Sequence, residues 1–89
     1  MPTVLVPTAY RGPTFGAAEI EVEGATIREC LEAVEVQFPN FVRQVIDDDG
    51  KVHNFVKLFL DDDEVPREDV DRAVDAGARV EILAAIAGG

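Results

Sequence analysis

Two segments near the start of the chain carry the hydrophobic pattern of β-strands. The first, Thr3 to Arg11, is rich in β-branched residues, and in the second, Ala18 to Glu23, apolar side chains alternate with glutamates. Such alternation is typical of a sheet with one face in water. Gly12 and Pro13 mark a turn between the two segments, so we expect a β-hairpin. Pro7 lies within the first segment, which predicts that this strand is at a sheet edge or bends there.

The segment Thr26 to Phe38 has the period of an amphipathic α-helix. Thr26 and Glu29 have the spacing of a capping box, in which each side chain accepts a hydrogen bond from the other's backbone N–H. Pro39 should end the helix at Phe38. A short helical turn over Phe41 to Ile46 should cover one end of the core. The apolar stripe of the main helix consists of Ile27, Leu31, Val34 and Phe38.

The second half of the chain contains three further strand signals. His53 to Leu60 alternates between two faces, Val65 with Pro66 suggests a very short strand after an acidic turn at Asp61 to Glu64, and Arg79 to Ala84 is the last strand. Residues 67–76 could form a short helix or an irregular turn, ended by Gly77. The side chains expected to point into the core are Val56, Leu58, Leu60, Val70, Val74, Val80 and Ile82.

This order of elements predicts an α+β domain of the β-grasp (ubiquitin-like) type. A mixed sheet of four to five strands would pack on one main helix. The first and last strands should be parallel neighbours in the middle of the sheet, because the helix provides the crossover that parallel pairing needs. Residues 1–89 are expected to form a single domain with a flexible Gly-Gly tail.

Charge and cysteine content narrow the possible partners and the compartment. The formal net charge is −10 and the pI is near 4.3, which argues against nucleic acid and favours a partner with a basic face. A single cysteine, Cys30, indicates a reducing compartment. The start of the chain lacks the basic flank of a secretory signal, and the longest apolar run, Ile82 to Ala87, is too short to span a bilayer. We therefore expect a cytoplasmic protein that does not contact membranes.

No catalytic constellation is visible in the sequence. His53 is the only histidine, and the chain has no serine for it to activate. Cys30 lies beside the apolar stripe and is interpreted as a core residue, whose neighbours Glu29 and Glu32 disfavour a thiolate. The acidic runs at 47–50 and 61–64 lack the alternating ligand order of a calcium loop, so they are interpreted as solvated turns without metal. We expect no chemistry within the chain itself.

The C-terminal tripeptide, Ala87, Gly88 and Gly89, is the remaining candidate site. It closely follows the last strand, and the two glycines lack a Cβ atom, so this end could enter a narrow channel. The five residues from Ala85 onward could span about 17 Å when extended. We therefore expect the terminal carboxylate to reach the active site of another protein, whereas the alternative is a frayed end without function.

Two stretches of the chain resemble the ubiquitin-like sulfur carriers of the MoaD and ThiS type. They are FVKLFLDDDEV, residues 55–65, and DAGARVEILAAIAGG, residues 75–89, within a resemblance that covers essentially the whole chain. The stretches VLVPTAYR and HNFVKLFLDDDEV are most similar to the actinobacterial carriers that supply sulfur to a cysteine synthase. Ala78 replaces the acidic residue that is usual in the turn, and Ala84 replaces a proline that often precedes the tail. These departures bear on the choice of partner.

The resemblance implies a mechanism centred on Gly89. A separate adenylyltransferase would use ATP to activate the carboxylate of Gly89, which would then become a thiocarboxylate and give its sulfur to a biosynthetic enzyme. Gly88 would keep the approach unobstructed. The chain would be a protein co-substrate rather than an enzyme, with no bound cofactor.

A docking surface for these partners is expected on the outward face of the sheet. Phe59 and Leu83 should point outward if their neighbours face the helix, and Ile86 has no obvious core to join. Adjacent outward apolar groups suggest an interaction patch, with Lys57 and Glu81 at its rim. The alternative is that Phe59 is partly covered by its own neighbours.

Two other functions remain open at this point. The chain could be the small subunit of a molybdopterin synthase, or a ubiquitin-like protein modifier whose Gly89 forms an isopeptide bond with a lysine. The receiving pathway also remains open among cysteine, molybdopterin, thiamine thiazole and a sulfur-containing secondary metabolite.

Overall fold

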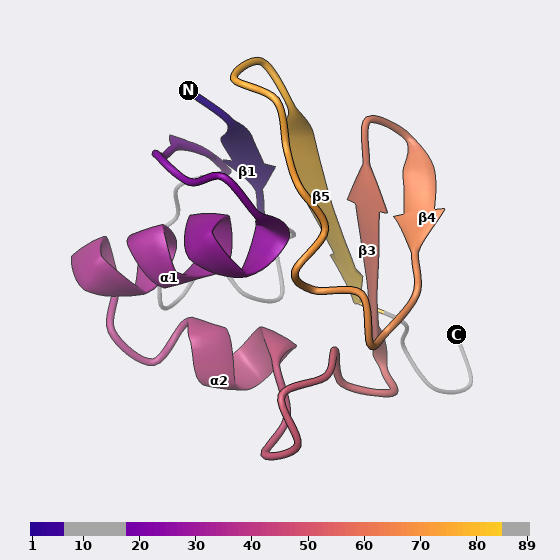
Figure 1. The fold of residues 1–89 in the computed structure, drawn as a ribbon. Helices are drawn as coiled ribbons and strands as arrows, with labels where there is room; N and C mark the ends of the chain where they lie inside the picture. Colours follow the sequence, from indigo (N-terminus) through magenta and orange to yellow (C-terminus); the bar gives the residue numbers. More distant parts are fainter. Residues whose placement is uncertain (7–17, 85–89) are drawn as a thin grey trace.

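The computed structural model describes residues 1–6 and 18–84, which form one mixed sheet with two helices on one side (Figure 1). The sheet has five strands in the order β2-β1-β5-β3-β4. The helices are α1, Ile27–Gln37, and α2, Val42–Val45. The strands are β1, Thr3–Leu5; β2, Glu19–Glu21; β3, Val56–Leu60; β4, Asp63–Val65; and β5, Arg79–Ala84.

The strand pairing confirms the predicted β-grasp arrangement. β1 and β2 form the antiparallel hairpin, and β1 runs parallel to β5. β3 is antiparallel to both β5 and β4. The predicted central position of the first strand beside the last strand is confirmed, because β1 lies between β2 and β5, and this excludes the edge position that was one of the two alternatives for the Pro7 strand. Pro7 itself lies outside the described residues, so the predicted bend at Pro7 stays a prediction.

The core lies between the sheet and the helices. Phe41, directly before α2, is fully buried, which confirms that this segment covers one end of the core. Val74, Phe38 and Leu60 are half-buried against the core. The predicted core residues that are fully or almost fully buried are Ile27, Cys30, Leu31, Val34, Val56, Leu58, Val70, Val80 and Ile82. Val4 and Ile20 on the first two strands are buried as well.

The start of α1 follows the predicted cap with one difference. The Thr26 Oγ1 accepts a hydrogen bond from the Glu29 N–H at 3.2 Å. The Glu29 carboxylate accepts from the N–H of Ala25 at 2.9 Å, one residue before the N–H that the capping box predicts. Both bonds still satisfy backbone N–H groups at the beginning of the helix, which have no partner within it.

Residues 67–76 form the irregular turn rather than the short helix. The carbonyls of Val70 and Arg72 accept hydrogen bonds from the N–H groups of Arg28 and Ile27, at 2.7 and 3.0 Å. A helix would use such carbonyls internally, whereas here they satisfy the first turn of α1. Gly77 therefore ends no helix.

The boundaries of β3 and β4 also differ from the prediction. The N–H of His53 donates to the carbonyl of Val45 at 3.0 Å, which keeps His53 outside the strand. β4 begins at Asp63, so the predicted acidic turn is shorter, and Pro66 follows the strand. The turn residues Asp61 and Asp62 have φ angles of 50° and 75°, as a two-residue type I′ hairpin requires.

The substitution Asp62→Gly should raise the free energy of unfolding by about 0.5–1 kcal/mol. Glycine has no Cβ atom and so removes the steric strain of the left-handed conformation at this residue, and this gain exceeds the entropy that glycine loses on folding. Asp61 is not the better site, since its Oδ1 accepts from the N–H of Arg79 at 2.9 Å. Urea unfolding followed by circular dichroism would measure the change. The control Asp63→Gly, in extended β4, should destabilise the protein. An unchanged or lower stability of the D62G variant would contradict the assignment of strain to this position.

Candidate functional site

The outward face of β3 and β5 brings together the described members of the predicted docking surface. Phe59 lies opposite Glu81, and Lys57 lies opposite Leu83. Side chains opposite each other on antiparallel strands contact directly, and diagonal neighbours such as Phe59 and Leu83 are within reach of long side chains. Leu83 is 40% exposed. Phe59 is half-buried, as expected if neighbouring residues of this chain cover part of its ring. The four residues are called the β3–β5 patch below.

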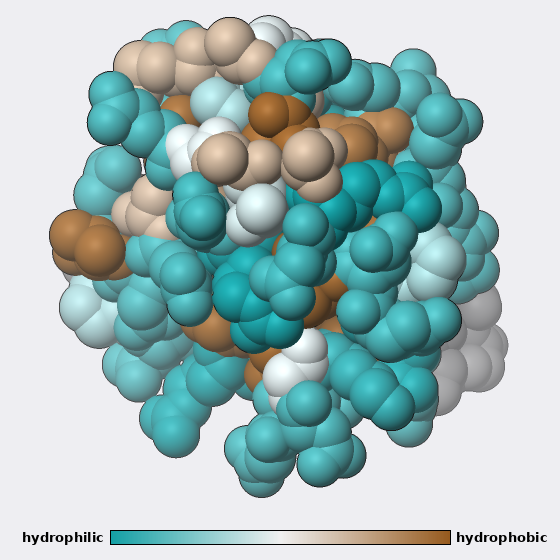
Figure 2. Space-filling model, in the orientation of Figure 1, coloured by the Kyte–Doolittle hydropathy of each residue, from teal (hydrophilic) through white to brown (hydrophobic). Residues whose placement is uncertain are grey.

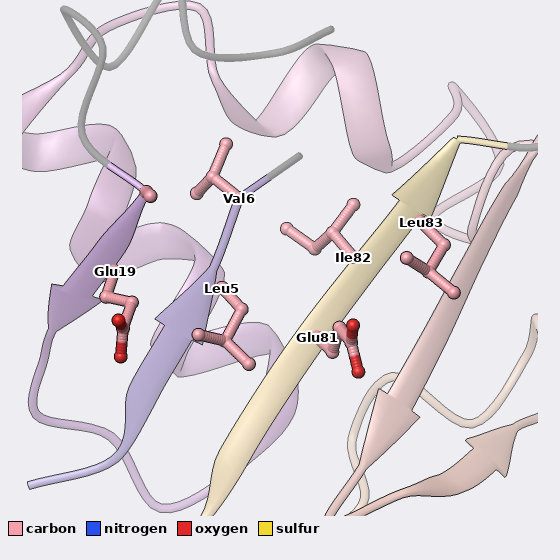
Figure 3. A pocket seen from close by; sticks show the side chains of 7 residues that line it. Leu5, Val6, Glu19, Glu81, Ile82 and Leu83 are labelled. Atoms are coloured by element: carbon pink, nitrogen blue, oxygen red, sulfur yellow. The ribbon is translucent and has the colours of Figure 1, made fainter. Parts of the chain in front are cut away.

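The patch continues onto β1 through a residue that the sequence reasoning missed. Leu5 lies beside Glu81 in the parallel register of β1 and β5 and is half-buried. Leu5, Glu81 and Leu83 line a hollow of about 280 Å³, which also borders Glu19 on β2 (Figure 3). The signal for Leu5 was available, since it follows the inward Val4 and must face the opposite side of the sheet.

Acidic groups flank the apolar part of this surface. Glu64 on β4 lies opposite Phe59, and Glu81 lies between Leu5 and Phe59 in the register. Glu19 forms an exposed ion pair with Arg79 at 3.7 Å. Across the sheet, apolar and acidic side chains therefore alternate in the order Leu5, Glu81, Phe59 and Glu64, and Lys57 adds one positive charge.

The tail leaves the described structure beside the beginning of β3. Ala84, the last residue of β5, lies opposite Val56. The tail residues Ile86, Ala87, Gly88 and Gly89 lie outside the described residues. Their predicted role in docking and in chemistry therefore stays a prediction.

Two aromatic residues directly precede β3. The rings of His53 and Phe55 are stacked, with centroids 4.8 Å apart and an interplanar angle of 17°. His53 Nε2 lies 3.0 Å from the carbonyl oxygen of Arg43. Phe55 is 51% exposed. The sequence placed Phe55 on an outward face but did not single it out as a site residue.

Cys30 is confirmed as a core residue. Its side chain is fully buried, and burial, followed by the charge of Glu29, raises the pKa of the thiol. A Cβ atom at Gly24 would lie 3.1 Å from the Cys30 Sγ and 2.9 Å from its backbone nitrogen, so only glycine allows the chain to pass this close. The thiol is thereby kept protonated and enclosed, unlike a reactive cysteine.

The first acidic run, residues 47–50, forms a turn held by hydrogen bonds to Asp47, whereas in the second run only Asp61 and Asp62 lie in the turn before β4. Asp47 Oδ1 accepts from the N–H groups of Asp49 and Lys51, at 2.9 and 3.0 Å. Its Oδ2 accepts from Arg67 at 3.3 Å. Within residues 1–6 and 18–84, no three histidine, cysteine or acidic side chains gather closely enough to hold a metal ion. In the same part of the chain, no helix has the length and apolar character needed to cross a membrane.

The sequence model of the ThiS family matches residues 4–89. The chain belongs to the ThiS family. Its curated relatives include the sulfur carrier proteins CysO of Mycobacterium tuberculosis and Mycobacterium bovis, each 30% identical over 90 residues, covering 98% of this chain and 97% of the relative. The family match therefore includes both stretches that carry the resemblance, residues 55–65 and 75–89.

Solved structures show that this ThiS-family chain shares its fold with CysO proteins. A chain of the Amycolatopsis orientalis BexX/CysO complex matches with a TM-score of 0.91 and 31% identity, covering all of both chains. CysO of Mycobacterium tuberculosis matches with a TM-score of 0.89 and 27% identity, covering 97% of this chain and all of that one. The small archaeal modifier protein SAMP1 of Haloferax volcanii, at 18% identity and a TM-score of 0.75, covers 99% of this chain and 98% of its own and shares the fold alone.

Asp47 should make the stability of the protein depend on pH in the acidic range. The N–H of Lys51, aided by that of Asp49 and by the charge of Arg67, holds the pKa of Asp47 below 3.8. A lowered folded-state pKa adds stability above the unfolded-state value, and this stability is lost as the pH falls through the folded-state value. The D47N variant should therefore be less stable than the wild type at pH 7, with a difference that shrinks as the pH falls through 3.8 and below.

Urea midpoints of the wild type and of D47N between pH 7 and pH 2 would measure this effect. Asp48→Asn, in the same turn, is the matched control for the loss of one charge. A constant difference between the wild type and D47N over the whole range would show that the carboxylate charge is not what stabilises the turn.

Proposed function

We propose that this chain is a sulfur carrier whose C-terminal Gly89 is adenylated by a separate enzyme, converted to a thiocarboxylate, and used to give sulfur to a biosynthetic enzyme. The observation that carries the proposal is the match to the ThiS family through residue 89, on a fold in which β5 leads from the sheet centre directly to the tail. The described residues offer a docking surface beside that exit and no set of catalytic side chains.

The chemistry at Gly89 needs no oxidant or reductant. A carboxylate oxygen of Gly89 attacks the α-phosphorus of ATP, and pyrophosphate leaves, which gives an acyl-adenylate. Hydrosulfide then attacks the acyl carbon, the bond to the AMP oxygen breaks, and a thiocarboxylate, AMP and one proton result. Adenylation supplies the leaving group that a free carboxylate lacks, and ATP is bound by the partner enzyme rather than by this chain.

The position of β5 explains how the body of the protein delivers the tail. β5 pairs with β1 as far as Glu81 and with β3 as far as Ala84, so the pairing with β3 fixes its end relative to the β3–β5 patch. The five residues after Ala84 span at most about 17 Å. The Gly89 carboxylate can therefore reach the active site of an enzyme bound to the patch only if the channel to that active site opens beside Leu83.

The charge distribution favours partners with basic surfaces. The net charge of −10 and the acidic residues Glu19, Glu64 and Glu81 on this face attract positive groups and accelerate encounter. We propose an adenylyltransferase of the ubiquitin-activating type as the first partner. We propose a cysteine synthase or a related sulfur-incorporating enzyme as the second, because the most similar stretches lie among carriers of that kind.

Removal of Gly88 and Gly89 should abolish sulfur transfer without unfolding the domain, because the buried core of the domain is built from residues that precede Ala84. The full chain, incubated with ATP, hydrosulfide and an adenylyltransferase that activates ThiS-family carriers, should exchange one oxygen for one sulfur, as seen by intact-mass measurement. The truncated chain should keep its original mass.

Several outcomes of this experiment would contradict the proposal. Sulfur gain by the truncated chain would show that Gly89 is not the site. Branched conjugates in cells without any thiocarboxylate would favour a protein modifier. Stable co-purification with a large subunit, together with loss of molybdoenzyme activity on deletion, would favour the molybdopterin synthase subunit.

The substitution Leu83→Thr should weaken docking while leaving the chemistry intact. Threonine keeps the strand propensity of this position but removes apolar area from the centre of the patch. We expect the KM for the carrier in the adenylation reaction to rise about tenfold at an unchanged kcat. Val36→Thr is the control, since Val36 is 84% exposed on α1. Equal KM values for the L83T variant and the wild type would place the docking surface elsewhere.

A further inference from the structure

We propose that Phe55 is an anchor for the enzyme that takes up the tail, and that its exposed ring fits an apolar patch at the mouth of that enzyme's channel. This inference rests on the proposed function. It adds a second contact point, outside the β3–β5 patch, at the end of the sheet from which the tail leaves.

The exposure of Phe55 is the first observation. Among the described residues, the large hydrophobic side chains that remain exposed are Met1, Val36, Phe55 and Leu83. Phe55 and Leu83 lie near the end of β5, whereas Val36 lies on α1. An exposed aromatic ring close to an apolar patch is typical of a protein–protein contact.

The strand register places Phe55 beside the tail exit. Val56 and Ala84 are opposite each other in the antiparallel pair of β3 and β5, and Phe55 is the residue before Val56. Its Cα atom therefore lies within about 9 Å of the Cα atom of Ala84. Figure 1 shows the connection from α2 to β3 at the same end of the sheet as the end of β5.

The short tail indicates that the enzyme that binds Gly89 also contacts the ring of Phe55. Residues 85–89 reach at most about 17 Å from Ala84, so an enzyme that holds the carboxylate of Gly89 must surround the end of β5 closely. The surface around its channel then faces Phe55. A second copy of this chain is a poor occupant, because each copy carries a net charge of −10.

The ring of Phe55 is held in position before any partner arrives. It stacks on His53, whose N–H donates to the carbonyl of Val45 and whose Nε2 contacts the carbonyl oxygen of Arg43. α2 thereby supports the aromatic pair. An aromatic side chain that is already fixed loses little conformational entropy on binding, which is the property of an efficient anchor.

The test compares Phe55→Ala with Phe55→Tyr and with Val36→Ala in the adenylation reaction, with ATP, hydrosulfide and the adenylyltransferase. Phe55→Ala should raise the KM for the carrier about tenfold at an unchanged kcat, because the tail is intact. Phe55→Tyr, which keeps the ring, and Val36→Ala, which removes an exposed side chain on α1, should match the wild type. Circular dichroism and urea midpoints check that each variant is folded.

The outcomes separate this inference from the proposed function. Sulfur gain by the wild type with the same KM for Phe55→Ala would overturn the anchor and leave the carrier function standing. An equal rise in KM for Val36→Ala would also overturn it, since the effect would not be local to the tail exit. A wild-type chain that gains no sulfur would overturn the proposed function and the anchor with it.

Discussion

The parallel pairing of β1 with β5 is the constraint on which the rest of the structure depends. It places the last strand between the first strand and β3, so that Val4 lies beside Val80 and Leu58 beside Ile82. These side chains are almost fully buried. β1 pairs with β5 over Arg79 to Glu81, and β3 pairs with it as far as Ala84, so the backbone of β5 is held along its length. The proposed delivery of the tail to another protein depends on such a fixed starting point.

The helix that makes this pairing possible is held by the segment that precedes β5. The carbonyls of Val70 and Arg72 accept from the first N–H groups of α1, and Arg28 forms an ion pair with Asp71 at 2.8 Å. Exposed ion pairs contribute little on their own, so the backbone hydrogen bonds carry most of this contact. The irregular turn is therefore a connection between the helix layer and the central strand rather than a loose loop.

The sequence allowed the fold to be predicted wherever a hydrophobic period was long enough. The stripe of α1 and the alternation in β5 gave both elements, and the capping residue Thr26 gave the start of the helix. The central position of the first strand followed from the need for a parallel neighbour, whereas the edge alternative rested on Pro7 alone and does not hold, because local backbone preference does not decide strand order. The helical alternative at 67–76 failed because tertiary hydrogen bonds use carbonyls that a helix needs internally.

The residues of the candidate site also differ in how far the sequence could predict them. Phe59, Leu83, Lys57 and Glu81 could be placed on one face by period-2 alternation, and the register brings them together. Alternation could also have placed Leu5 on the outward face, but the exact neighbours of Leu5 and Phe55 required the strand register. Leu5 joins the patch through the parallel register with β5, and Phe55 joins the tail exit through the pair of Val56 and Ala84. Such relations between distant segments are not visible in any local pattern.

The acidic surface also affects which contacts the sheet makes. β2 and β4 are the edge strands, and both carry exposed acidic residues: Glu19, Glu21, Asp63 and Glu64. Charged side chains on edge strands oppose pairing with the edge of another copy. Hydrophilic residues cover most of the face seen in Figure 2. Like charges on such edges oppose edge-to-edge pairing of two copies, and the same charge would attract the basic surface of the proposed partner enzyme.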